Sequence, residues 1–212
     1  YVYNKLVKTK FKDLSILAGA AVAITLLVWL PHFLSLPDFW GLNFQAGFNT
    51  IYRNFDGLEY VIIAKTFYNP VTLASLPQSL PAVYFASHFP GYAILIGTFA
   101  PILGFLKSML FVSLLSTILA TFAFYFLVRD FKLSAHPLFL GILFLFLPAR
   151  WLIIRSVGSS EPTFILFIIL ALYFFMKFEA SGKLKNILFA ALFGLFAQIT
   201  RPPGILLFIA LS

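Results

Sequence analysis

Residues Leu14–Leu36 have the sequence LSILAGAAVAITLLVWLPHFLSL, 23 residues without Asp, Glu, Lys or Arg. At 1.5 Å per residue, a helix of this length spans roughly 34 Å, enough to cross the hydrocarbon core of a bilayer. A signal peptide is the competing interpretation, but its apolar region is shorter and ends in a small-residue cleavage site. Here Pro37, Asp38 and Trp40 follow, without an Ala-x-Ala pattern. The sequence therefore predicts an uncleaved first membrane span.

The whole chain shares this apolar character. Of its 212 residues, 61% are hydrophobic and 10% are charged, and the mean hydropathy is +0.98. A soluble domain carries about 25% charged residues, so we expect an integral membrane protein surrounded by membrane lipids. The net charge of +8 fits cytoplasmic loops rich in Lys and Arg. No basic run is long enough to follow a nucleic-acid backbone, so we expect no nucleic-acid partner. The absence of cysteine excludes disulfides and thiolate metal sites.

Further apolar runs predict an all-α, polytopic transmembrane helix bundle that forms one domain over residues 1–212. Residues 89–106 contain Pro90 and Pro101 and are short for a span, so they predict either a re-entrant segment or a short span. Because the chain begins at Tyr1 and ends inside an apolar run, we expect it to be the N-terminal part of a longer protein. The predicted spans cover residues 14–36, 108–128, 137–154, 162–176 and 187–200, with another starting at 204.

A loop over residues 37–90 separates the first span from the next apolar run. The lysines within residues 1–13 place the N-terminus in the cytoplasm, so this loop is expected to be extracytoplasmic and to contain interfacial helices. The topology of the rest depends on whether 89–106 crosses the membrane. The non-crossing arrangement is favoured, because it gathers the otherwise unexplained charges on the outer side: Asp38, Asp56, Glu59, Arg150, Arg155, Glu161 and Arg201.

The most polar stretch that keeps a helical pattern is 53–68, RNFDGLEYVIIAKTFY. We expect a helix over 54–68 that lies along the membrane surface with its apolar face towards the lipid. Two interpretations of Asp56 and Glu59 remain open. Their Asp-x-x-Glu spacing is that of a capping box, in which Asp56 accepts hydrogen bonds from backbone amides. Alternatively, Asp56 takes a proton from an acceptor hydroxyl.

Glu161 also has two interpretations. In the sequence Ser-Ser-Glu-Pro at 159–162 it suits the start of a helix, with Pro162 in the first turn. It would equally serve as a second acid facing Asp56, for substrate hydroxyls or a metal. A lone histidine in an aromatic loop, such as His88, is usually structural, and the three histidines have no close pairing that indicates a metal site.

Arginines near the span ends suit phosphate binding. Arg201 stands directly before Pro-Pro-Gly, where a helix must break, and irregular backbone at membrane depth is tolerated where it lines a cavity. A guanidinium there can hold a phosphate with two parallel hydrogen bonds. Arg155 is a second candidate for phosphate contact. The alternative for such arginines is that they extend to the lipid headgroups without a further role.

Four segments, in order, resemble a known family. Residues 54–64, NFDGLEYVIIA, resemble the Trp-Asp-Gly-x-x-Tyr/Phe-x-x-Ile-Ala motif of the mannosyltransferase that adds the second mannose in GPI-anchor synthesis, and of its prokaryotic relatives. Residues 88–92, HFPGY, are similar to its Phe-Phe-Pro-x-Tyr-Pro motif. Residues 148–150, PAR, with 159–164, SSEPTF, are similar to its Pro-Ala … Tyr-Ser-Glu-Ser-x-Phe pattern, and residues 200–205, TRPPGI, to Thr-Arg-x-x-Gly.

The resemblance implies a GT-C glycosyltransferase, an inverting hexosyltransferase of the mannosyltransferase kind. Such an enzyme moves a mannose-like hexose from a polyprenyl-phosphate sugar, dolichyl phosphate in eukaryotes, to a lipid, glycan or protein acceptor. Its active site is extracytoplasmic, at the plasma membrane of a prokaryote or the ER membrane of a eukaryote. Asp56 maps to the catalytic acid of the first loop. The substrate-binding residues are expected to be Glu59, His88, Arg155, Glu161 and Arg201.

No cofactor is expected, and a divalent metal stays an open alternative. The sequence departs from the family pattern at Phe55, which replaces Trp, and at Pro162, which replaces Ser after the glutamate. Gly91 and Ala93 also alter the Pro-x-Tyr-Pro segment. These differences concern the acceptor and the donor sugar, and they leave both acids in place.

Two other functional classes compete with an enzyme. A transporter or lipid flippase would carry charges at mid-span and broken helices in paired halves. Here the acids stand at span ends, and a single break is visible in the sequence, at Arg201-Pro202-Pro203. A non-catalytic membrane subunit explains the hydrophobicity but not the gathering of acids and arginines on one side. The sequence therefore favours the enzyme.

Overall fold

The computed structural model describes the backbone of residues 2–211 and the side chains of residues 11–211. Over these residues the chain is all-helical, and the only extended pairing is an isolated bridge between Phe39 and Leu42. The helices are α1 Val2–Phe33, α2 Phe48–Tyr52, α3 Gly57–Thr66, α4 Pro70–Ser75, α5 Ala82–Phe85, α6 Pro90–Leu103, α7 Phe105–Asp130, α8 Pro137–Phe144, α9 Ala149–Ile154, α10 Glu161–Ser181, α11 Leu184–Thr200, the 3-10 turn η1 Pro202–Gly204 and α12 Ile205–Leu211.

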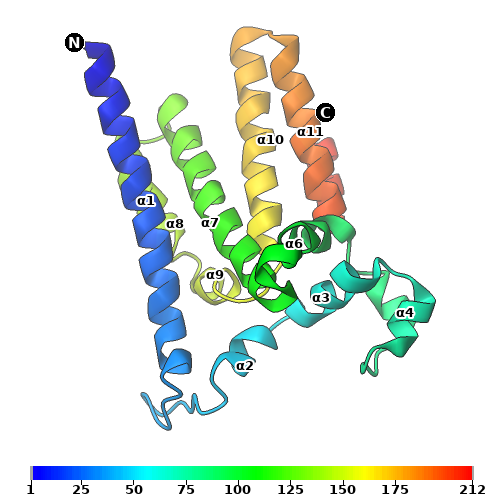
Figure 1. Cartoon of the computed structure of the whole chain (residues 1–212). Helices are drawn as coiled ribbons and strands as arrows, with labels where there is room; N and C mark the ends of the chain where they lie inside the picture. Colours follow the sequence, from blue (N-terminus) through cyan, green and yellow to red (C-terminus); the bar gives the residue numbers. More distant parts are fainter. Residues whose placement is uncertain (1, 212) are drawn as a thin grey trace.

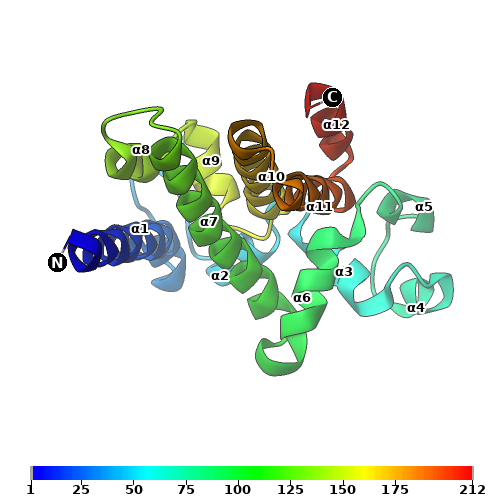
Figure 2. The same cartoon turned by 90° about the horizontal axis from the view of Figure 1, so that it is seen from above.

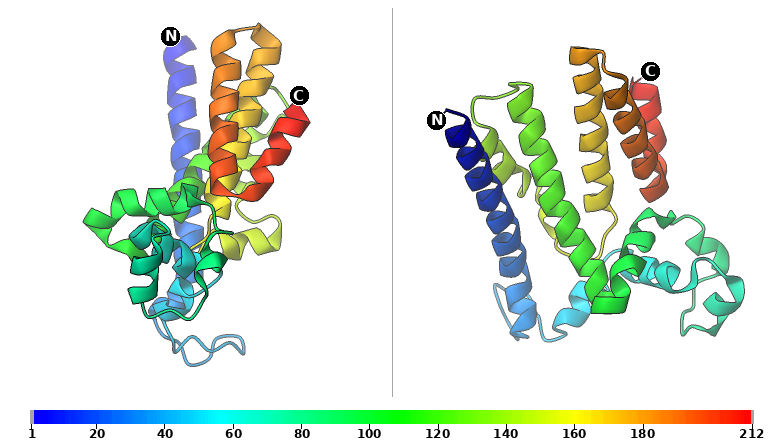
Figure 3. Two further views of the ribbon diagram at one scale, coloured as in Figure 1. Left: turned by 90° about the vertical axis from the view of Figure 1, so that its right-hand side faces the viewer. Right: turned by 45° about the horizontal axis from the view of Figure 1, so that its top comes forward.

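The long helices α1, α7, α10 and α11 stand side by side, as Figure 1 and the view from above in Figure 2 show. Within the described part of the chain, three segments are long and apolar enough to cross a membrane: Phe11–Phe33, Phe105–Asp130 and Glu161–Ser181. The predicted span at 187–200 corresponds to α11, which has 17 residues and is shorter than the usual 20 or so. After η1 the chain turns, and α12 runs back alongside α11 (Figure 3).

The inner face of α7 is built from small and hydroxylated residues. Ser113, Ser116, Thr117, Ala120 and Thr121 are all buried there. Small side chains let helix backbones approach closely, which is how helices associate within a bilayer. The Ser116 and Thr163 hydroxyls are 2.8 Å apart and hydrogen bond α7 directly to α10.

The sequence predicts one span over 137–154, and this prediction is wrong, because these residues do not form a continuous helix. α8 ends at Phe144, and a new helix, α9, begins at Ala149. Pro148 causes the interruption, because proline lacks the amide hydrogen of the helical ladder and its ring disfavours a helical conformation for the preceding residue. The Leu145 carbonyl, freed from the ladder, accepts a hydrogen bond from Arg155 Nε at 2.9 Å.

Helices α2 to α6 gather at the end of the bundle opposite the N-terminus. α6 lies across this end instead of running beside the long helices (Figures 1 and 3). The helix predicted over 54–68 is shorter, because Phe55 and Phe67 have φ values of 52° and 44° that a right-handed helix cannot contain. The expected contact of its apolar face with lipid is also wrong. Tyr60 and Ile63 on that face are buried in a core shared with α6 and α7.

We predict that the α7–α10 contact tolerates loss of a hydroxyl but not added volume. Ser116→Ala removes one interhelical hydrogen bond and is expected to cost about 0.6 kcal/mol. Ser116→Leu inserts a large side chain where α7 and α10 meet and is expected to cost about 1–3 kcal/mol. Unfolding in mixed detergent and SDS measures both free energies. Equal costs for the two variants would contradict the close packing of these helices.

Candidate functional site

A close backbone approach brings the first loop against the segment that precedes α10. A Cβ atom on Gly57 would lie 2.7 Å from the Gly158 carbonyl oxygen and 2.9 Å from Met109 Sδ. Real Cβ atoms essentially never come so near to other atoms, so the start of α3 fits here only because residue 57 is glycine. The contact places Asp56 beside the segment that leads to Glu161.

A second close approach joins α6 to the end of α11. A Cβ atom on Gly91 would lie 2.6 Å from Thr200 Oγ1 and 2.9 Å from the Ile199 carbonyl oxygen. The first turn of α6 therefore packs directly on the last turn of α11. The two motifs at 88–92 and 200–205, distant in sequence, are neighbours in space, and Arg201 follows immediately.

Asp56 does not form the predicted capping box. It occupies the N-cap position of α3, but its side chain accepts no hydrogen bond from the helix amides. Its φ of −86° and ψ of 20° depart from the extended conformation that aims a capping side chain at them. The Asp56 side chain is 59% exposed, and its Oδ2 lies 3.8 Å from His88 Nε2. The capping interpretation is therefore wrong, and the carboxylate is free to meet a ligand.

His88 is held tightly beside Asp56. It is buried, and its ring packs edge-on against Tyr60 with 5.3 Å between centroids. Its Nδ1 lies 3.3 Å from the Tyr84 carbonyl oxygen, and its own carbonyl accepts a hydrogen bond from the Tyr68 hydroxyl at 2.5 Å. Burial raises the pKa of Tyr68 to about 12. These contacts leave Nε2 as the ring atom that faces Asp56.

Glu161 and Arg201 form an ion pair between the start of α10 and the end of α11. The Ser159 hydroxyl donates a hydrogen bond to Glu161 Oε2, and Arg201 Nη1 is 3.4 Å from Ser160 Oγ. Both charged side chains are about 30% exposed. The pair therefore stands at the edge of the bundle, where a ligand can reach it.

Tyr60 of α3 is a buried tyrosine near this end of the bundle. Burial raises the pKa of its phenol, and the charges of Glu161 and Asp56 act in the same direction. The Ser160 side chain and the positive charge of Arg201 oppose the shift. The Tyr60 ring is buried, with 5.3 Å between its centroid and that of His88 and 5.2 Å between its centroid and that of Tyr92.

Tyr92 fixes the segment that precedes Glu161. Its hydroxyl donates to the Met109 carbonyl oxygen at 2.8 Å, lies 2.6 Å from Ser113 Oγ and accepts from the Ser159 amide at 3.2 Å. One buried hydroxyl therefore joins α6, α7 and the start of α10. Sequence reasoning did not assign roles to Tyr60 and Tyr92, although both tyrosines stand within the motifs that the sequence analysis singled out.

Arg155 does not join this group. It is 1% exposed, and its guanidinium donates to the Leu145 carbonyl oxygen and, at 2.9 Å, to Thr25 Oγ1 of α1. These hydrogen bonds tie α1 to the α8–α9 break, whereas Nη2 of Arg155 is buried without a hydrogen-bond partner among residues 11–211. The contact of Arg155 with substrate stays a prediction. The Glu59 Oε2 atom is buried without a hydrogen-bond partner in the described part of the chain.

An apolar groove of about 250 Å³ runs beside Glu161. It lies between the α8–α9 break and α10, and Trp151 is one of its lining residues. The indole N–H of Trp151 is buried and has no hydrogen-bond partner among residues 11–211. Its two charged lining residues are Arg150 and Glu161. The remaining lining residues are Phe144, Leu147, Pro148, Ile154 and Ile165.

Among the described side chains, no group of three or more His, Asp and Glu residues could hold a metal ion. Comparisons of the chain with protein-family models, with curated proteins and with solved structures gave no match.

The two arginines are predicted to respond differently to truncation. Arg155→Ala leaves a cavity and unpaired polar groups in the interior, and we expect a loss of about 2–4 kcal/mol in unfolding free energy. Arg201→Ala removes a partly exposed ion pair, and Ser159 still donates to Glu161, so a loss below about 1 kcal/mol is expected. Unfolding in mixed detergent and SDS measures the unfolding free energies of both variants. A larger cost at Arg201 would contradict the structural role assigned to Arg155.

Proposed function

We propose that this chain is a GT-C-type membrane glycosyltransferase that moves a hexose from a polyprenyl-phosphate sugar to an acceptor hydroxyl. The observation that carries the proposal is the close contact of Gly57 with Gly158, which brings the loop that carries Asp56 against the segment that leads to Glu161 at one end of the bundle. Arg201 stands beside them. Structural packing alone does not require two acids and an arginine to gather at a surface that a ligand can reach.

Asp56 is the base of the proposed reaction. It accepts the proton of the acceptor hydroxyl while the hydroxyl oxygen attacks the anomeric carbon of the sugar. The bond from that carbon to the phosphate oxygen breaks, and the polyprenyl phosphate leaves from the opposite face, which inverts the configuration. The absence of a capping hydrogen bond supports this role, because amide donors would lower the basicity of the carboxylate.

Arg201 is the proposed phosphate-binding residue. Its guanidinium can form two parallel hydrogen bonds with phosphate oxygens and offset the charge that develops on the leaving group. The ion pair with Glu161 holds it in place before the donor binds. Glu161 in turn would contact substrate hydroxyls, together with His88 and Glu59.

The donor chain is proposed to lie in the apolar groove between α9 and α10. Two features support this placement: the groove is lined mainly by hydrophobic side chains, and Glu161 belongs to both the groove and the polar site. The position of α6 across the end of the bundle supports the topology in which 89–106 does not cross the membrane (Figure 1). In that topology the site faces the extracytoplasmic side.

Asp56→Asn is predicted to reduce hexose transfer from polyprenyl-phosphate sugars by about 10²–10⁴-fold, since an amide cannot accept the proton. The measurement is transfer of labelled hexose by the protein in membranes, tested with a panel of lipid-linked sugars. Asp38→Asn is the matched control: Asp38 is in the same loop, and its Oδ1 accepts a hydrogen bond from the nearby Gly41 amide. Unchanged transfer by Asp56→Asn would refute the proposed base.

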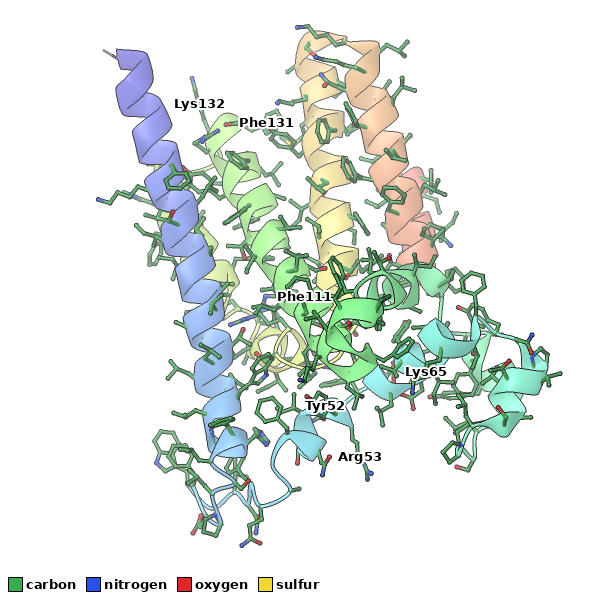
Figure 4. The ribbon with its side chains drawn as sticks, in the orientation of Figure 1. Tyr52, Arg53, Lys65, Phe111, Phe131 and Lys132 are labelled. Atoms are coloured by element: carbon green, nitrogen blue, oxygen red, sulfur yellow. The ribbon has the colours of Figure 1, made fainter. Side chains whose placement is uncertain are left out.

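Arg201→Lys keeps the charge but loses the planar pair of donors. We expect the KM for the lipid-linked donor to rise by about tenfold or more, with a smaller change for the acceptor. Arg53→Lys is the control, because Figure 4 shows the Arg53 side chain pointing away from the bundle. Equal donor KM values for the parent and Arg201→Lys would exclude a phosphate contact by Arg201.

A further inference from the structure

Besides the apolar groove, a second cavity lies at the opposite end of the bundle from the candidate site. It has a volume of about 480 Å³ and is lined by residues from the end of α7 and from α10, α11 and the turn between them. In Figure 1 these segments lie at the same end as the N-terminus, and Figure 4 labels Phe131 and Lys132 where α7 ends. The lining residues that matter below are Phe131, Phe174, Lys177, Lys183, Lys185 and Phe189.

The cavity carries an excess of positive charge. Its one acid is Asp130, which already accepts hydrogen bonds from Arg129 Nε at 2.8 Å and from the Tyr173 hydroxyl at 2.7 Å. The Lys177 ammonium lies over the Tyr173 ring, 4.7 Å from its centroid. In the described part of the chain, neither Lys183 nor Lys185 forms an ion pair. Glu179 is exposed on α10 and does not line the cavity.

The turn that carries these lysines is rigidly tied to α10. Asn186 is 7% exposed, and its amide donates to the Lys177 carbonyl oxygen at 3.2 Å and to Ser181 Oγ at 2.9 Å. Gly182, with a φ of 62°, ends α10 in the left-handed conformation that allows the turn. The two hydrogen bonds fix the start of α11 against α10, so the lysines of the turn are held over the cavity.

Aromatic side chains supply the apolar part of the cavity. The Phe174 and Phe189 rings are 5.0 Å apart between centroids, and Phe189 is 43% exposed. These rings lie on α10 and α11 towards the middle of the bundle, below the lysines. The arrangement places positive charge at the mouth and hydrocarbon beneath it.

We propose that this cavity binds an anionic phospholipid, with its phosphate headgroup at Lys177, Lys183 and Lys185 and its acyl chains against the phenylalanines. Basic pockets between helices near a membrane surface recognise lipid headgroups in this way. Because α7 and α10 are long enough to cross a bilayer, their ends stand at headgroup depth. A free phosphate ion would use the lysines but not the aromatic wall. The proposal does not depend on the glycosyltransferase activity.

The test is native mass spectrometry of the purified chain with phosphatidylglycerol or phosphatidylcholine. We expect phosphatidylglycerol to bind more tightly, and we expect Lys183→Gln with Lys185→Gln to weaken its binding by roughly 25-fold, or roughly fivefold for each lysine. Lys12→Gln with Lys132→Gln removes the same charge from the same end of the bundle, outside the cavity, and is expected to change binding less than about threefold. All four lysines are exposed, so folding should persist, and circular dichroism checks it.

Three outcomes would overturn the site. The first is equal affinity of the parent and the Lys183/Lys185 variant for phosphatidylglycerol. The second is an equal loss in the control variant, which would indicate general surface attraction. The third is displacement of the lipid by inorganic phosphate, which would mean that the lysines bind a phosphate ion without the acyl chains.

Discussion

The close contact between the start of α3 and the segment before α10 is the constraint on which the candidate site depends. Gly57 rests on the Gly158 carbonyl with no room for a Cβ atom. This contact places the first-loop acid near the acid of α10. The parallel contact of Gly91 with Thr200 brings the end of α11 to the same place. Without these two approaches, Asp56, Glu161 and Arg201 would belong to unconnected parts of the chain.

The polar side chains discussed above form two groups: buried ones with structural hydrogen bonds, and exposed ones that a ligand can reach. Arg155 is buried without a carboxylate, and it compensates for the break between α8 and α9 by supplying hydrogen bonds. The buried Tyr92 hydroxyl also forms structural hydrogen bonds, at the junction of α6, α7 and the start of α10. Asp56, in contrast, is largely exposed, and Glu161 and Arg201 are partly exposed. Unpaired polar groups are costly in an apolar interior, and the hydrogen bonds of Arg155 and Tyr92 reduce that cost.

The two ends of the bundle differ in their chemistry. The end formed by α2 to α6 carries acids, an arginine and tyrosines in close proximity, with an apolar groove beside them. The other end carries lysines and aromatic rings around a cavity, and the acid there, Asp130, already accepts a hydrogen bond from Arg129. The proposed reacting site and the proposed lipid-binding site have different requirements, and the long helices keep these two sets of residues apart.

The sequence by itself determined the all-helical class and the three long apolar helices, because uninterrupted hydrophobic runs are a local property. It also indicated the polar first loop, whose motif residues Asp56 and Tyr60 stand near the start of a helix. It did not determine the break before Pro148, since the apolar run alone allowed a continuous span. Nor did it determine that the Asp56 side chain makes no capping hydrogen bond, since the spacing allowed a capping box. Only the tertiary structure decided the different roles of Arg155 and Arg201. Their partners, Thr25 for one and Glu161 for the other, lie far away in the chain, and no local pattern records which distant groups meet.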